Sequence, residues 1–347
     1  MSAEPASAPV VMPKKSSSGL SVLQGLTLLG LLILMWVALS FATKTFWTPG
    51  NISNLLRQGA MTAILAIGET FVIITGGIDL SVGAIVGFTS MIVAWLLTNG
   101  DFLSQYNLGF FATIPGAIFL TLLTGLAIGL FHGFGIVQLG LPPFIMTLAT
   151  MYALRGIGLL ITNGATISIT NDTFTEFSRK SFLGLPWTDG GWFEMPVLFW
   201  MVVVVAVPGY VFLHRSRWGR YLFAIGSNME ASRLSGVNVR EMIYIAYILS
   251  AVCAAFVGVL LAMRIGIGNP TQAESWELQA IASSVIGGTS LFGAVGSVHG
   301  PLLGSFILTT INNGANLLNL NSFWQRIITG LLIIVVVYFD QLRRKKG

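Results

Sequence analysis

The amino-acid sequence predicts an all-α polytopic membrane protein with about ten transmembrane helices and both chain ends in the cytoplasm. Hydrophobic residues make up 54% of the 347 residues, whereas charged residues make up only 9%. A soluble domain carries about 25% charged residues, so a soluble fold of this length could not cover its surface. The few charges are also separated by long apolar runs. An ordinary soluble enzyme, a secreted disulfide scaffold and a disordered protein are therefore disfavoured.

The chain begins with a polar segment followed by a first apolar run. Residues 1–19 are rich in Ser, Ala and Pro, so we expect a disordered cytoplasmic tail. The run at 20–42 is too long for the core of a signal peptide and lacks a small-residue cleavage site. We therefore expect it to be retained as the first span.

The remaining spans are read from runs with few or no charges, because about 20 mostly apolar residues cross a bilayer. Two of the runs are long enough for two spans each, and glycine-rich segments at 133–143 and 287–297 divide them. The runs are 58–78, 80–100, 102–154, 195–214, 242–263, 278–325 and 323–339. With the first span, they give the predicted total.

An even number of spans places both chain ends on one side, and the positions of Lys and Arg indicate which side. Most of the 18 Lys and Arg residues fall on the inner segments if the N-terminus is cytoplasmic. The sequence thus predicts a membrane domain at 20–340 and a basic cytoplasmic tail at 341–347. The domain includes an outer loop at 163–194 and a basic inner loop at 214–241, and neither could hold a catalytic domain.

No pattern in the sequence indicates catalysis or metal binding. The three histidines are far apart, and the single cysteine, Cys253, excludes an intrachain disulfide and a cysteine-based metal site. The sequence contains no H-E-x-x-H, no G-x-S-x-G and no nucleotide-binding P-loop. We expect no catalytic residue, metal or bound cofactor here. The net charge of +5 does not predict nucleic-acid binding either, because no soluble face is available to carry it.

Polar residues inside the predicted spans are candidates for function, because ionisable groups in a bilayer need a partner or a wet cavity. Glu69, roughly 20 Å into the second span at 1.5 Å per residue, could face a transport path or be protonated and bonded to a neighbouring helix. Asp79 could act as a gate, but capping of the third span is favoured. For Arg155, in the outer half of the fifth span, we favour a structural role at an outer gate.

Of Asn312, Asn313 and Asn316, two must share a helix face. They could contact a passing solute, but bonds between helices are favoured.

The inner loop is the most informative segment. A short helix between Gly226 and Gly236 is expected, with Asn228 as its N-cap. Small residues would let a partner approach closely, and three arginines offer charged contacts. The alternative is a basic loop held by anionic lipid headgroups. Two segments of the chain also resemble each other, GGIDLSVGAIVG at 76–87 and GGTSLFGAVG at 287–296. This similarity is compatible with an internal repeat but does not establish one.

Several motifs together resemble the permease subunits of ribose-type (monosaccharide) ABC importers of bacteria. They are G-x-N-x-x-A-x-x-L-S-G-V-N at 226–238, ITGGIDLSVGA at 74–84, PPFIMTLATMYALRGIGLLITNG at 142–164, LQAIASSVIGGTSLFG at 278–293 and NNGANLL at 312–318. The resemblance covers most of the chain from about residue 50 to the last span. The tails and residues 165–194 fall outside it.

The resemblance implies a multi-pass protein of the bacterial inner membrane that imports a monosaccharide by alternating access. It implies cytoplasmic ATPase subunits that carry ATP and Mg, a periplasmic sugar-binding protein, and a second permease copy, either identical or a paired paralogue. Membrane lipid is the remaining expected partner. The implied ATPase-docking residues are Arg220, Gly226, Asn228, Glu230, Ala231, Leu234, Ser235, Gly236 and Asn238. Family members often have Glu directly after the Asn, whereas here Met229 precedes Glu230, which leaves the role of Glu230 open.

Two other functions remain as alternatives. One is an ABC permease for another small solute, such as a branched-chain amino acid, because those subunits share part of the pattern. The other is a secondary transporter, for which Glu69 is the single candidate in a coupling-ion site. The outer loop at 163–194 and the turn at 264–277, with Glu274 and Glu277, are expected to form the docking face for the binding protein.

Overall fold

The computed structural model describes residues 18–186 and 192–346, and most of these residues are helical. The predicted tail at 1–19 lies outside the described residues except for its last two positions, which belong to the first helix. The longer helices are α1 (Ser18–Ala42), α2 (Pro49–Ile74), α3 (Val82–Thr98), α5 (Ile114–Val137), α6 (Pro143–Thr162), α8 (Val197–Tyr210), α11 (Val239–Ile265), α13 (His299–Leu317) and α14 (Ser322–Lys346). The shorter helices are α4 (Gly100–Gln105), η1 (Gly109–Ala112), α7 (Asp172–Phe177), η2 (Val211–Arg215), α9 (Arg217–Ser227), α10 (Met229–Leu234) and α12 (Trp276–Ile286).

Seven helices in the described part of the chain are long and apolar enough to cross a membrane. They are α1, α2, α5, α6, α8 with its continuation η2, α11 and α14. The chain is therefore an all-α, multi-pass membrane protein, as predicted. The other three expected spans correspond to α3, α12 and α13. Of these, α12 has 11 residues and a length of about 16 Å, roughly half of the 30 Å hydrocarbon core.

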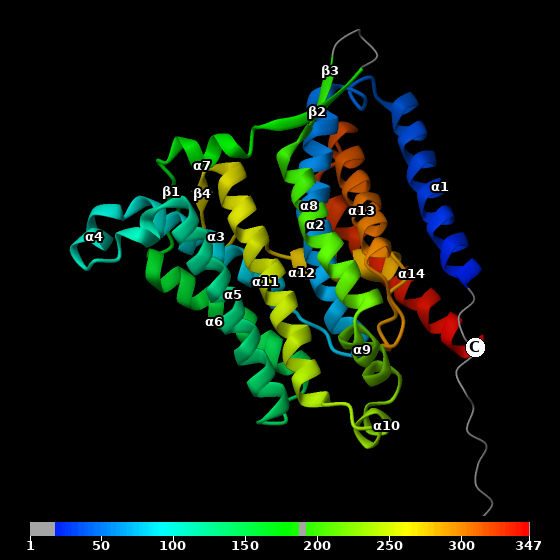
Figure 1. Cartoon of the computed structure of the whole chain (residues 1–347). Helices are drawn as coiled ribbons and strands as arrows, with labels where there is room; N and C mark the ends of the chain where they lie inside the picture. The colour runs from blue at the N-terminus through cyan, green and yellow to red at the C-terminus, as the bar shows by residue number, and fades with distance from the viewer. Residues whose placement is uncertain (1–17, 187–191, 347) are drawn as a thin grey trace, which may run out of the picture.

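Helix α2 occupies the centre of the assembly (Figure 1). It packs against α11 on one side and against α12 and α13 on the other, while α11 also contacts α3 and α5. Thr48 caps α2 by accepting a hydrogen bond from the backbone of Asn51, and Pro49 suits the first turn. Helix α2 thus begins nine residues before the predicted run at 58–78. Glu69 consequently lies about 30 Å along the helix, not roughly 20 Å from its outer end.

Close packing between α5 and α11 depends on glycine. A Cβ atom at Gly129 would lie 2.5 Å from the Cα atom of Ile248, and one at Gly125 would lie 2.5 Å from the Cβ of Ala255. Both distances are too short for any side chain. Small residues therefore allow these two membrane helices to approach backbone to backbone.

Between α2 and α3 the chain is not helical. Helix α2 ends at Ile74, Gly76 adopts a positive φ of 82°, and helix α3 begins only at Val82. The intervening segment, residues 75–81, contains Asp79 and Ser81, whose relative exposure is 0% for both. Non-helical backbone of this kind is tolerated at membrane depth only where protein or a water-filled cavity surrounds it.

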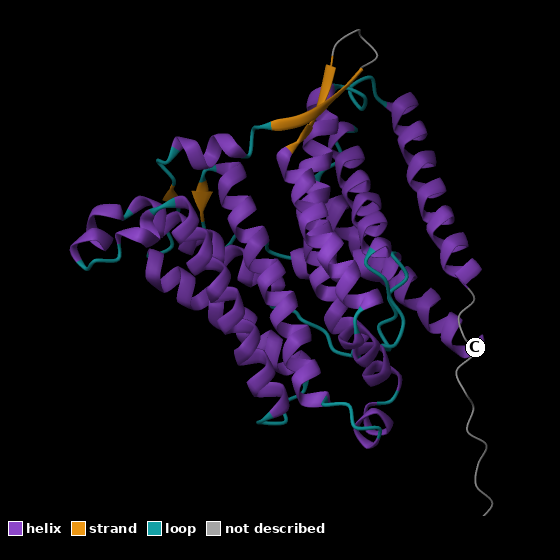
Figure 2. Ribbon diagram, in the orientation of Figure 1, coloured by secondary structure: helices purple, strands orange, loops and turns teal. Residues whose placement is uncertain are grey.

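The few strands gather toward one end of the helical assembly (Figure 2). Strands β2 (Ser181–Pro186) and β3 (Trp192–Pro196) form an antiparallel hairpin, whereas β1 (Ile167–Ser168) pairs with β4 (Ile267–Gly268). The β1–β4 pair joins two segments far apart in sequence. The outer loop at 163–194 and the turn at 264–277, both predicted to face the binding protein, are therefore adjacent.

The opposite end carries α9 and α10, which form most of the inner loop (Figure 1). Helix α14 ends in the same half of the view, and α1 rises from there toward the strands. Leu222 and Ile225 of α9 are buried, while Arg217 and Arg220 of the same helix are exposed. Helix α9 is thus amphipathic and packs its apolar face on the membrane domain.

Candidate functional site

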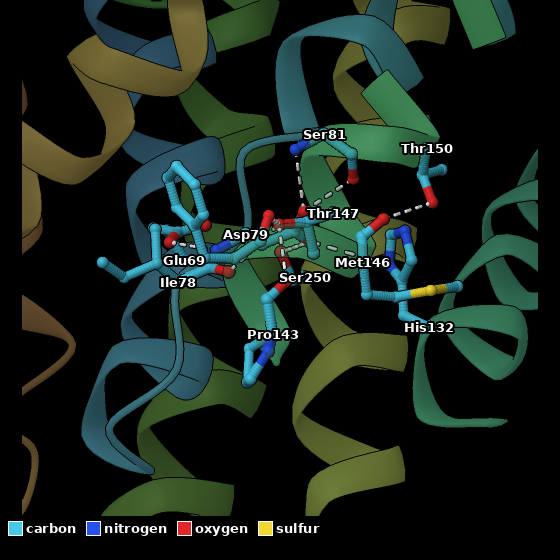
Figure 3. Close-up of polar contacts among 11 residues, drawn as sticks. Glu69, Ile78, Asp79, Ser81, His132, Pro143, Met146, Thr147, Thr150 and Ser250 are labelled. Carbon is cyan, nitrogen blue, oxygen red and sulfur yellow. Dashed lines mark hydrogen bonds and ion pairs between the residues drawn. The ribbon is translucent and has the colours of Figure 1, made fainter. Parts of the chain in front are cut away.

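A buried polar cluster surrounds the segment 75–81 (Figure 3). Glu69 of α2 is 0% exposed, and its Oε1 accepts a hydrogen bond of 3.0 Å from the backbone N–H of Asp79. Thr147 of α6 donates a hydrogen bond of 3.3 Å to the carbonyl of Ile78. Two helices thus hold the same non-helical segment from different sides.

The Asp79 carboxylate makes three hydrogen bonds inside this cluster. Its Oδ1 accepts from the backbone N–H and the hydroxyl of Ser81, at 2.9 and 2.6 Å, and its Oδ2 accepts from the hydroxyl of Ser250 at 3.0 Å. Ser81 is the residue that precedes α3, and its own side chain makes no capping bond. Asp79 therefore forms a turn with Ser81 and a bridge to α11, which differs from the simple N-cap that we favoured.

Two further polar side chains face the cluster, and neither was singled out from the sequence. His132 of α5 is 0% exposed, and its Nδ1 lies 4.0 Å from the Asp79 Oδ2. The rings of His132 and Tyr247 are in edge-to-face contact, with centroids 5.9 Å apart. Because Asp79, His132 and Tyr247 come from separate elements, sequence spacing gives no signal of their proximity.

Glu69 is enclosed by protein in this conformation, and its role in transport stays a prediction. The carboxyl group is enclosed by protein, so it does not line an open path, and its partner is a backbone N–H. Among the described residues, no group of three or more His, Cys, Asp and Glu side chains could hold a metal ion. We infer from its hydrogen bonds that the cluster holds the segment 75–81 against α2, α6 and α11.

A polar cavity of about 220 Å³ lies elsewhere, between α2, α11, α12, α13 and α14. Its lining combines amide, hydroxyl, guanidinium and indole groups and contains no carboxylate. The lining residues are Gln58, Thr62, Arg264, Trp276, Gln279, Thr309, Asn312, Asn316 and Gln325. At about 30 Å³ per water molecule, this space holds roughly seven waters or one small polar solute.

A second cavity, of about 330 Å³, adjoins the first through the shared residues Gln279, Asn312 and Gln325. It extends along α14 to Thr329 and Ile333 and carries one acidic and one basic residue, Glu274 and Arg326. The two spaces together form one compartment beside the half-length helix α12. We call the smaller one the amide cavity.

The three asparagines of α13 divide between two roles. Asn312 and Asn316, one helical turn apart, both line the amide cavity, and Asn316 also accepts a hydrogen bond of 2.7 Å from Gln325. Asn313 instead exchanges two hydrogen bonds with Asn51 of α2, at 2.7 and 3.2 Å. Two asparagines, Asn312 and Asn316, share a helix face as predicted, and both Asn313 and Asn316 bond to another helix.

Arginines anchor the outer part of this compartment. Arg155 donates to the carbonyls of Pro270 and Gln272, at 2.9 and 3.2 Å, and so holds the turn that precedes α12. Arg264 donates to Asn54 of α2 at 2.6 Å. Arg155 thus holds the turn at 264–277 through two hydrogen bonds, and its role in gating stays a prediction.

The predicted docking residues lie mostly on the exposed side of the inner loop. Asn228 caps α10 as predicted, because its Oδ1 accepts from the backbone N–H of Ala231 at 2.9 Å. Leu234 is 78% exposed and Met229 is 48% exposed, so α10 presents bare apolar side chains away from the membrane domain. The other exposed residues of the predicted set are Arg220, Asn228, Glu230, Ala231, Ser235, Gly236 and Asn238.

The contacts of two members of the docking set, Glu230 and Gly226, need separate description. Glu230 forms an exposed ion pair with Arg233, whose guanidinium Nη2 and Nε donate to it at 2.6 and 3.0 Å. The hydrogen bond from Arg233 lowers the pKa of Glu230, so this carboxylate is ionised and already paired at neutral pH. Gly226 does not belong to the exposed face, because it packs inward against the backbone of Ile74 and Ala294.

Most of the cavity lining was not identified from the sequence. Gln58, Gln279 and Gln325 each stand at or near the edge of an apolar run, where an amide looks like the end of a span. The sequence contains one sign of this cavity: glutamine and asparagine side chains recur in several of the predicted spans. Their convergence depends on the packing of α12 against α2, α13 and α14, which the sequence does not state.

The chain is similar in sequence to known transport permeases. A family described as "Branched-chain amino acid transport system / permease component" matches residues 51–337. The ribose import permease protein RbsC of Bacillus subtilis is 39% identical over 92% of this chain and 92% of its own length.

Two relatives from Escherichia coli extend the comparison. Its ribose import permease protein RbsC is 35% identical over 92% of this chain and 94% of its own length. Its xylose transport system permease protein XylH is 32% identical over 93% and 95%. No solved structure matches the chain.

Proposed function

The chain belongs to the family described as "Branched-chain amino acid transport system / permease component", and we propose that it is the membrane-spanning permease subunit of an ABC importer for a monosaccharide. The observation that carries the sugar assignment is the amide cavity. The relatives named for ribose and xylose support the same substrate class.

The lining of the amide cavity suits a neutral polyhydroxylated ring. Side-chain amides and hydroxyls both donate and accept hydrogen bonds, which matches the dual character of sugar hydroxyls. The indole of Trp276 offers a flat apolar surface for the C–H face of the ring. Weak and hydrated contacts also suit a permease, because a transported solute must leave again.

A branched-chain amino acid fits this lining less well. Its ammonium group calls for a carboxylate and its side chain for an apolar wall, whereas the amide cavity has no acidic residue and few apolar ones. A secondary transporter needs a coupling-ion site that the solute can reach. Glu69, the candidate for that site, is enclosed and bonded to Asp79.

ATP hydrolysis belongs to a partner in this proposal. The chain carries no P-loop, so ATP and Mg would bind cytoplasmic ATPase subunits. The exposed face of α10, with Leu234 and Met229, is the surface proposed for these subunits.

The opposite end would receive a periplasmic sugar-binding protein. The strand pair β1–β4 joins the outer loop to the turn that precedes α12, so one surface connects that docking face to the cavities. We place the chain in a bacterial inner membrane, with about ten membrane segments if α3, α12 and α13 are counted and with both chain ends in the cytoplasm. A second permease copy and lipid would complete the assembly.

The proposal is tested by transport into vesicles that contain the complete complex, purified through a tag on this chain from its own cells. Uptake of labelled ribose and xylose is compared with uptake of labelled leucine. ATP is supplied on the side of the vesicle membrane that carries the ATPase subunits. We expect import of a sugar and none of leucine. Import of leucine without any sugar would refute the substrate class.

A further inference from the structure

Three backbone segments meet at Gly226, near the end of α9. A Cβ atom placed on Gly226 would lie 2.5 Å from the backbone N of Ala294 and closer still to the carbonyl oxygen of Ile74. Ile74 ends α2, and Ala294 belongs to the turn between α12 and α13. The contact therefore leaves room for no side chain, and Gly226 is required there for close approach.

The same place holds a hydrogen bond between the other two segments. The N–H of Ala294 donates to the carbonyl of Ile74 over 2.9 Å. A helix leaves its last carbonyls without partners inside the helix, so the turn satisfies one of them. The hydrogen bond thus joins the second of the two similar glycine-rich stretches, 287–296, to Ile74, which lies two residues before the first stretch, 76–87.

Each segment leads to a different functional part. From Gly226 the chain passes into α10, the exposed surface proposed for the ATPase. From Ile74 it passes through residues 75–81 to Asp79 and the buried cluster. The turn with Ala294 follows α12, which carries Trp276 and Gln279 of the amide cavity.

The turn is also fixed from its other side. The Asp340 carboxylate of α14 accepts hydrogen bonds from the hydroxyl of Ser290 and the N–H of Leu291, both at 3.1 Å. Gln325, near the start of the same helix, lines the amide cavity. The turn therefore does not move freely between α9 and the rest of the protein.

We propose that Gly226 is a positioning residue for transport, which fixes the docking helices to both inner turns so that they move as one unit. A displacement of α10 would be passed through this backbone contact to the segment 75–81 and to α12 together. The inference rests on the proposed function, because it needs an ATPase that moves α10. It removes Gly226 from the docking surface and gives it a role inside the chain.

The test uses the complete complex with Gly226→Ala. A methyl group at this position would separate α9 from Ile74 and Ala294. The matched control is Gly156→Ala in α6, where a Cβ would meet nothing within 4 Å. We expect the ATPase to copurify in wild-type amount while sugar uptake falls by about tenfold, within the range that mutations along a coupling path produce. The Gly156→Ala complex should keep both the ATPase content and the sugar uptake of the wild type.

Each other outcome has a defined meaning. Wild-type uptake by Gly226→Ala would overturn the proposal. Loss of the ATPase from a folded variant would also overturn it, because Gly226 would then act in docking. If the wild-type complex itself contains no ATPase or imports no sugar, the proposed function fails, and this result is distinct from either variant result.

A distance measurement covers the case in which Gly226→Ala does not fold. Spin labels are placed at Ser227 and Val295, both exposed, in a Cys253→Ser background. A third position, Phe134 of α5, is 48% exposed and gives a reference pair with Ser227. Between the ATP-free and vanadate-trapped complexes, we expect the 227–295 distance to stay constant and the 227–134 distance to change. A change in the first, or no change in either, would overturn the proposal.

Discussion

The Glu69 carboxylate accepts a hydrogen bond from the backbone N–H of Asp79 at 3.0 Å, so a side chain of α2 holds the chain just after α2 has ended. This contact gives Oε1 of the buried carboxyl group a partner, whereas Oε2 has none among the described residues. A buried backbone N–H in a non-helical segment needs an acceptor, and Glu69 provides it. The carboxyl group therefore has a structural task before any role in transport is considered.

Removing this acceptor should destabilise the protein. Glu69→Ala leaves the N–H of Asp79 buried without a partner, which costs about 1–3 kcal/mol, whereas Glu69→Gln keeps an acceptor oxygen. Thermal unfolding in detergent should show a lower midpoint for the alanine variant and a nearly unchanged one for the glutamine variant. The control is Glu176→Ala, because Glu176 is an exposed residue of α7. If the unfolding midpoint of Glu69→Ala equals that of the wild type, Glu69 does not stabilise the segment 75–81.

The reciprocal amide pair Asn51–Asn313 should stabilise the contact between α2 and α13. A double-mutant cycle with Asn51→Ala and Asn313→Ala isolates the pair, whose two hydrogen bonds measure 2.7 and 3.2 Å. We expect a coupling energy of about 1 kcal/mol, typical of side-chain hydrogen bonds between membrane helices. Additive effects of the two substitutions would show that the pair contributes nothing beyond its separate side chains.

Asn312 and Asn313 are neighbours in sequence but should differ in function. Asn312→Ala removes an amide from the cavity lining, so sugar uptake should fall by up to about tenfold while thermal stability is kept. Asn313→Ala should lower stability more than Asn312→Ala does. Uptake rates and unfolding midpoints of both variants are measured on the same preparations. Equal uptake by Asn312→Ala and the wild type would remove the amide cavity from the transport path.

The exposed leucine of α10 provides a test of docking. Leu234→Arg changes a side chain that is 78% exposed, so it should leave the fold intact and abolish copurification of the ATPase. Glu241→Gln is the control, because Glu241 is an exposed residue of the same inner loop and lies outside the predicted docking set. Full association of the ATPase with the Leu234→Arg variant would place the docking surface elsewhere. Gly236→Arg is a less specific test, since Gly236 has a positive φ of 82°.

The sequence predicted those features that depend on short-range rules. Asn228 caps α10 because capping involves residues three positions apart, and Asn312 and Asn316 share a face because they are one helical turn apart. The multi-pass architecture follows from composition and from charge-free runs. These signals are local, so a single sequence contains them in full.

The remaining features depend on packing between distant segments. The proximity of His132 to Asp79 and the burial of Gly226 against Ile74 require the positions of three or more helices. The run at 278–325 predicted two spans, but α12 is a half-length helix, because a charge-free run does not distinguish a full span from a short helix within the protein. The charge of Arg57, eight residues after Pro49, ended the charge-free run and so concealed the true start of α2.

In the proposed function, this chain provides a path for a sugar and takes its driving force from a separate ATPase. The most direct measurement is accumulation of labelled ribose or xylose by vesicles that contain either the purified chain alone or the complete complex with its ATPase, binding protein and ATP. We predict accumulation against a gradient only in the complete complex, and its loss when ATP is omitted. Uphill accumulation by the chain alone, driven by an imposed proton gradient, would contradict the account.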